Sequence, residues 1–134
     1  MKTQGEIEAE VCHTIASLEQ EVMGRGPKDI KVHLLGDRLV VRLQCVLTTS
    51  EQHLVKTEKG RDLIKQVRTQ LIEFARPVMD AMVQTATGVK VLSLRHDITP
   101  NTGEEVVRFT LAKAPLVREK KSRQSVLQDY SQLG

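Results

Sequence analysis

The chain repeats one layout twice: an amphipathic helix, a glycine, a strand, a tight turn and a second strand. The first copy comprises a helix at 3–23 and strands at 29–35 and 38–47. The second comprises a long helical region ending near 86 and strands at 89–98 and 104–112. One helix and one hairpin cannot bury both of their apolar faces, whereas two such units side by side can. We therefore predict an α+β fold in which two α-β-β units form a four-stranded antiparallel sheet with two main helices packed on one face.

Each helix carries an apolar stripe, and we expect that stripe to face the sheet. Spacings of three and four residues place side chains on one side of a helix. In the first helix the stripe is Ile7, Val11, Ile15, Leu18 and Val22. In the long helix it is Leu63, Val67, Leu71, Phe74, Val78 and Met82. Gly60 is predicted to separate a short first helical piece from this long one, and Pro77 is predicted to kink it.

Alternation along the strands predicts one apolar and one mixed, partly basic sheet face. The inward positions of the second strand are Leu39, Val41, Leu43 and Cys45. The outer face is predicted to gather Lys31, His33, Arg42, Lys90 and Arg108. Such a face suits a phosphate backbone or an acidic partner, and it equally suits a solvated surface that pairs with Glu104 or Glu105. Sheet-based RNA readers stack bases on aromatic side chains, and this face offers none, so nucleic-acid binding is not favoured.

The two-layer design leaves one sheet face and two sheet edges uncovered. Natural proteins pair or protect exposed strand edges. We therefore expect a homodimer through an edge or through the open face.

The basic charge of the chain is concentrated at its C-terminal end. The 134 residues have a net charge of +3, and residues 113–134 hold all of that excess. Apolar residues make up 40% and aromatic residues only 2%, so the core must be aliphatic. We predict one domain at 1–112 and a basic, flexible tail at 113–134, whose Arg118, Lys120, Lys121 and Arg123 are candidate partner-binding residues. The absence of a signal peptide or a long apolar run, which would need roughly 20 residues, favours the cytoplasm.

The segment Gly24-Arg25-Gly26-Pro27-Lys28 is the most distinctive loop. Its glycines and cations could present N–H groups and positive charge to an anion. The competing interpretation is a helix C-cap followed by a turn. It is not a phosphate-binding loop of the G-x-x-x-x-G-K-[ST] type. We keep Arg25, Gly26 and Lys28, together with Arg61 and Arg76, as candidate ligand-binding or anion-binding residues.

No catalytic residue, metal site or cofactor is predicted. The four histidines lie on different elements without metal-ligand spacing. His96-Asp97 could be a base with its orienting carboxylate, yet no activated Ser or Cys can be assigned beside it. We therefore expect a protein that is not an enzyme.

Several segments in order resemble the MpsC family of bacterial proteins. They are TQGEIEAEV, MGRGPKDIKVHLLGDRLVVRL, KTEKGRDLIKQVRTQLIEFARP and TGVKVLSLRHDITPNTGEEVVRFTL, within residues 3–112. The family is described as part of a sodium-translocating, membrane-potential-generating system. Arg25, Arg61 and Arg76 match recurring positions of the family, and folding alone explains them least.

The resemblance implies an accessory or adaptor protein that docks on a partner, such as a membrane complex for ion or inorganic-carbon uptake. Peripheral contact with the inner face of the membrane is part of that expectation, and the basic tail suits it. Two alternatives stay open: a regulatory protein that senses a small anion or ligand, and a nucleic-acid-binding module.

Overall fold

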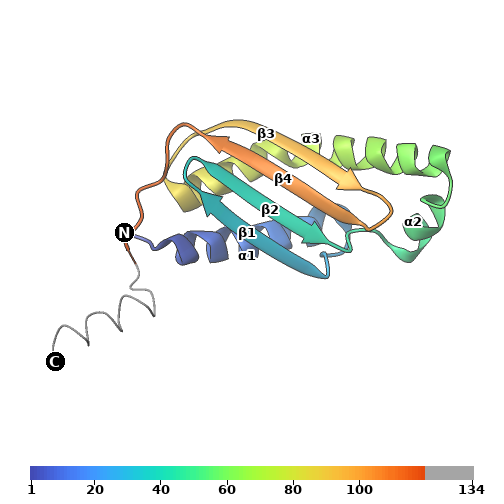
Figure 1. The fold of residues 1–134 in the computed structure, drawn as a ribbon, viewed down its shortest axis with the longest axis horizontal. Coiled ribbons are helices and arrows are strands. Elements are labelled where there is room, and N and C mark those ends of the chain that lie inside the picture. Colours follow the sequence, from blue (N-terminus) through green and yellow to red (C-terminus); the bar gives the residue numbers. More distant parts are fainter. Residues whose placement is uncertain (120–134) are drawn as a thin grey trace, which may run out of the picture.

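A computed structural model describes residues 1–119 of the chain. Helix α1 (Gln4–Met23) precedes the hairpin of β1 (Asp29–Leu35) and β2 (Arg38–Gln44). A short helix α2 (Thr49–Leu54) leads into the long helix α3 (Glu58–Thr87), and the hairpin of β3 (Val91–Thr99) and β4 (Glu104–Leu111) follows (Figure 1). The predicted strand at 38–47 ends earlier, at Gln44, because Cys45 adopts a left-handed backbone with φ 56° and its side chain is exposed.

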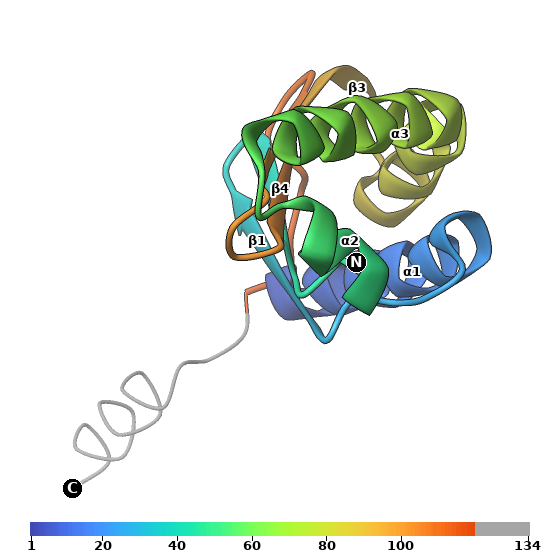
Figure 2. The ribbon, with the colours of Figure 1, turned by 90° about the vertical axis from the view of Figure 1, so that its right-hand side faces the viewer.

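The four strands form one antiparallel sheet in the order β1-β2-β4-β3. The second strands of the two hairpins are therefore neighbours at the centre. Both long helices lie on one side of the sheet and leave the other side open (Figure 2). This confirms the predicted α+β class, the four-stranded antiparallel sheet and the packing of the helices on one face.

Helix α1 forms where the sequence predicts it. The Thr3 side chain accepts a hydrogen bond from the backbone N–H of Glu6 at 3.1 Å and caps the first turn. The predicted stripe is buried at Ile7, Val11, Ile15 and Leu18. It packs on the aliphatic inner face of the sheet, whose largest buried side chain is Phe109.

The break between α2 and α3 lies at 55–57 and not at Gly60, so that prediction is wrong. Gly60 sits in the first turn of α3, where Thr57 is the N-cap residue. A Cβ atom at Gly60 would lie 1.7 Å from the carbonyl oxygen of Leu54. The glycine is therefore required by the close approach of the two helices and does not end a helix.

The face of α3 that meets the sheet differs from the predicted stripe. Leu63, Val67, Phe74 and Val78 are 47%, 41%, 77% and 47% exposed. The buried face consists of Gly60, Ile64, Arg68, Ile72, Ala75, Met79, Val83, Ala86 and Thr87. The sequence contains two apolar stripes on α3, and the fold buries the one with the smaller residues. The other, Leu63, Val67, Phe74 and Val78, is hereafter the outer stripe.

A charged cluster inside the core explains how the buried stripe can contain Arg68. The Arg68 guanidinium donates through Nε to Glu105 Oε2 at 3.3 Å and through Nη2 to Glu19 Oε1 at 3.3 Å. All three residues are at most 5% exposed. Burial raises the pKa of Glu19, against the lowering effect of Arg68, whereas the two carboxylates keep the pKa of Arg68 raised despite its desolvation. The cluster ties α1, α3 and β4 together.

Candidate docking surface on the sheet

The open side of the sheet carries a row of side chains that crosses all four strands. The strand register places His33 beside Val40, Val40 beside Arg108, and Arg108 beside Arg95. His33, Arg95 and Arg108 are exposed. Side chains alternate between the two faces of a strand, so these four residues point away from the helices. We call this row and its two neighbouring rows the outer sheet face.

Arg95 and Arg108 are a like-charged pair directly opposite each other. Like charges in that position destabilise a sheet. Neither arginine has an acidic side-chain oxygen within 4.0 Å in the part of the chain that the structure describes. The fold therefore keeps two cations together and exposed at a local cost in stability, which is typical of a surface that binds negative charge.

Each of the two neighbouring rows holds an arginine that has an acidic partner. One row holds Leu35, Arg38, Thr110 and Ser93. The other holds Lys31, Arg42, Val106 and Asp97. Arg42 is paired with Glu104 at 3.2 Å. Arg38 lies 3.6 Å from Asp37. In the part of the chain that the structure describes, the arginines of this face without an acidic oxygen within 4.0 Å are therefore Arg95 and Arg108 of the central row.

Most of the cations predicted for this face are found on it. Lys31, His33, Arg42 and Arg108 occupy outward positions, and Lys90 immediately precedes β3 at the end of the sheet. The sequence analysis missed Arg38 and Arg95. Arg95 could have been found by continuing the alternation from Leu94 along β3.

The predicted anion-binding residues are dispersed, and each of the three arginines has a partner within the folded chain. Arg25 donates through Nη1 to the carbonyl of Leu47 at 2.9 Å and through Nη2 to that of Cys45 at 3.3 Å. Arg61 donates to the carbonyl of Val55 at 3.0 Å, at the end of α2. Arg76 lies 3.6 Å from Asp80, one turn along α3.

The two remaining members lie in the loop after α1. Gly26 donates its backbone N–H to Gln20 Oε1 at 3.0 Å, and the Lys28 side chain is exposed. A hollow of about 290 Å³ lies next to the carbonyls that receive Arg25 and Arg61. No charged side chain is among its lining residues, which are Cys45, Leu47, Gln52, Val55, Pro100, Asn101, Thr102 and Gly103. Binding of an anion by these residues stays a prediction.

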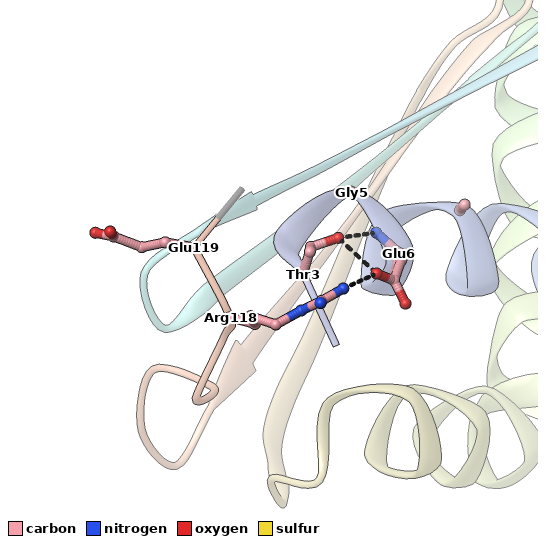
Figure 3. A pocket seen from close by; sticks show the side chains of 6 residues that line it. Thr3, Gly5, Glu6, Arg118 and Glu119 are labelled. Atoms are coloured by element: carbon pink, nitrogen blue, oxygen red, sulfur yellow. Dashed lines mark hydrogen bonds and ion pairs between the residues drawn. The ribbon is translucent and has the colours of Figure 1, made fainter. Parts of the chain in front are cut away.

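The beginning of the predicted tail is attached to the N-terminus. Arg118 donates its backbone N–H to the carbonyl of Lys2 at 2.8 Å, and its guanidinium lies 3.1 Å from Glu6 (Figure 3). The hydroxyl of Thr3 and the guanidinium of Arg118 hold the pKa of Glu6 below its ordinary value. Arg118, which follows the predicted domain boundary at 112, therefore contacts Lys2 and the first turn of α1. Lys120, Lys121 and Arg123 lie outside the described residues.

The predicted pairing of His96 with Asp97 is not formed. His96 lies beside Val107 and Asp97 beside Val106, so the two point to opposite faces of the sheet. Among residues 1–119, no group of three or more His, Cys, Asp or Glu residues is arranged to hold a metal ion.

Comparison with known proteins assigns the chain to a family. Residues 3–113 match the family described as "Na+-translocating membrane potential-generating system (MpsC)". The chain is 34% identical over 110 residues to the Bacillus subtilis protein YbcI, covering 82% of this chain and 89% of that one. It is 30% identical over 86 residues to YrhF of the same organism, covering 63% and 70%. Both relatives are described as uncharacterized proteins. No solved structure gives a significant match. The match over 3–113 establishes that this chain belongs to the MpsC family.

Proposed function

We propose that this chain is a non-catalytic accessory protein of an MpsC-type, membrane-potential-generating system, and that it docks on an acidic protein surface through its outer sheet face. The observation that carries the proposal is the exposed pair of Arg95 and Arg108, which has no acidic partner among the described residues. Family membership supports the kind of system in which the docking takes place. The proposed location is the cytoplasm, at the inner face of the membrane.

An acidic protein suits the outer sheet face better than a nucleic acid does. None of the outward residues on its three rows is Phe, Tyr or Trp, so bases would find no ring to stack on. Arginine can hold carboxylates through two parallel hydrogen bonds, which gives both strength and orientation. Within residues 1–119, no helix has the length and apolar character needed to cross a bilayer, so the proposal assigns ion movement to the partner and not to this chain.

The experiment is affinity capture from cells of the native host, followed by quantitative mass spectrometry. The double variant Arg95→Glu/Arg108→Glu reverses the charge of the pair while leaving the core untouched. Lys56→Glu/Lys65→Glu is the matched control, since it makes the same change of charge at exposed positions on the helical side. We expect a membrane transport component to be captured with the wild type and the control, and to be lost with the sheet variant.

The salt dependence provides a second measurement on the purified pair. At 0.1 M salt the Debye screening length is about 10 Å, and it becomes shorter as salt is added. The attraction between exposed charges on two proteins therefore weakens as the salt concentration rises. Affinity should therefore fall steeply between 50 and 300 mM salt for both the wild type and the control variant. Equal capture of the same partners by the wild type and the sheet variant would remove the outer sheet face from the function.

A further inference from the structure

The outer stripe of α3 is an apolar surface on the side of the helix layer that faces away from the sheet. Phe74 at 77% and Leu63 and Val78 at 47% are unusually exposed for large apolar residues. The stripe as a whole exposes on the order of 400 Å² of apolar surface, a size that on a monomer commonly marks an interaction site. Its members come from one helix and lie within about 40° of one direction around it, at about 100° per residue.

The apolar positions of the outer stripe are spaced symmetrically about its centre, because Leu63 and Val67 are as far from the centre as Val78 and Phe74. A two-fold axis between Gln70 and Leu71 would place Leu63 against Val78 of a second copy and Val67 against its Phe74. Two-fold dimers use the same patch on both subunits, so a self-complementary patch is what such an interface requires. The stripe spans about 22 Å at 1.5 Å per residue, which is four turns of contact.

A groove beside the outer stripe lies where this axis would place the second copy. It runs between α1 and the C-terminal half of α3, with a volume of about 420 Å³. Its lining residues are Glu10, Thr14, Pro77, Val78, Ala81, Met82 and Thr85. Leu63 of the second copy would lie against Val78, which lines this groove. Its side chain would therefore pack into the groove in the knobs-into-holes manner of paired helices.

The charges beside the outer stripe also suit antiparallel pairing. Lys59 lies on one flank near the start of α3, and Asp80 lies on the same flank near its end. In an antiparallel pair related by a two-fold axis, each flank meets itself in reverse, so Lys59 approaches Asp80 of the second copy. Asp80 Oδ2 lies 3.6 Å from Arg76 Nε, so Lys59 of the second copy would join an existing ion pair.

We propose that two copies of this chain associate through the outer stripes of their α3 helices, antiparallel, about an axis between Gln70 and Leu71. The helix layers then form a four-helix bundle between two sheets. This places both outer sheet faces on the outside of the dimer, where each remains available for a partner. The surface differs from the sheet edge or open sheet face that the sequence suggested for a homodimer.

Engineered disulfides test the proposal and its register. The starting protein is the full chain with Cys12→Ala and Cys45→Ser, which removes both native cysteines. Leu63→Cys with Val78→Cys in one chain should give a covalent dimer on mild oxidation. Either substitution alone should not, because the axis leaves two copies of residue 63 about 22 Å apart at 1.5 Å per residue.

The matched control is Lys65→Cys with Arg76→Cys, which has the same axial relation to the axis but lies about half a turn away around α3. We expect no cross-linking from it. Cross-linking by Leu63→Cys alone would show parallel pairing and overturn the arrangement. A non-reducing gel with monomer only, from every variant, would overturn the association itself. Phe74→Glu should abolish the dimer while a single chain still binds acidic partners through Arg95 and Arg108, so the two proposals can fail separately.

Discussion

The buried charge cluster makes a strong prediction about stability. Arg68→Met keeps an unbranched, flexible side chain and removes its charge, leaving Glu19 and Glu105 in the core without their cation. Removing one partner from a buried ion pair costs about 3–5 kcal/mol, mainly because a desolvated charge is left uncompensated. A domain of this kind has a free energy of unfolding of about 5–15 kcal/mol. The variant should therefore lose roughly a fifth or more of its stability.

The measurement is urea unfolding followed by circular dichroism at pH 7.5, at one fixed protein concentration. A triple variant, Arg68→Met/Glu19→Leu/Glu105→Leu, is the control, because replacing all three charges by apolar residues is often neutral or stabilising. We expect the triple variant to recover most of the loss. Arg68→Met should also become more stable as the pH falls from 7.5 to 5, since its two buried carboxyls take up protons in the folded state. A variant within 1 kcal/mol of the wild type at pH 7.5, with no such pH dependence, would refute this reasoning.

Three further changes have expected outcomes. Glu19→Gln should raise stability at pH 7.5: burial raises the pKa of Glu19 in the folded state, so the stability this group contributes is present in acid and lost as the pH rises through that pKa. A lower free energy of unfolding in urea for this variant than for the wild type would contradict the prediction. Gly60→Ala should lower the free energy of unfolding by about 2 kcal/mol or more, because the new Cβ would overlap the carbonyl of Leu54. Gly5→Ala, in open space on α1, should raise it by about 0.5–1 kcal/mol. Equal melting temperatures of the two variants would argue against the close approach of α2 and α3. Thr48→Ala should lower the free energy of unfolding by about 1 kcal/mol, because Thr48 and Glu51 form a capping box at the start of α2. Thr49→Ala is the control, and urea unfolding should show it to be more stable than Thr48→Ala.

The sequence predicts the sheet well because its strands are local patterns with unambiguous turns. Alternation places Leu39, Val41 and Leu43 inward, and all three are fully buried. Gly36-Asp37 joins β1 to β2 as a two-residue turn in which the first position has a positive φ of 64°. Placing the two units side by side predicts one sheet but not which strands meet at its centre, and the structure shows that β2 pairs with β4.

Helix α3 is where prediction from pattern fails, and the reason is physical. Its outer stripe is richer in large apolar residues than its buried face, which includes Gly60, Ala75 and Arg68. Local spacing favours the stripe without a charge. The compensation for Arg68 comes from Glu19 on α1 and Glu105 on β4, which are 49 and 37 residues away in the chain. No periodicity within one helix can reveal partners that only the tertiary fold brings together.

The same holds for the candidate surfaces: the sequence predicts what local alternation determines, but not the contacts that only the tertiary fold forms. The cations of the outer sheet face follow from alternation, although Arg95 was overlooked. The arginines of the anion hypothesis stand out as sequence features, yet Arg25 and Arg61 reach backbone carbonyls that only the folded chain brings near.

The mass of the protein in solution tests most directly whether the second apolar face of α3 is covered. Sedimentation equilibrium at micromolar concentration should give twice the 15.0 kDa of one chain for the wild type. Phe74→Glu should give the mass of a single chain while retaining the helix and sheet signals of the fold. A wild type that remains a single chain up to the highest soluble concentration would contradict the account.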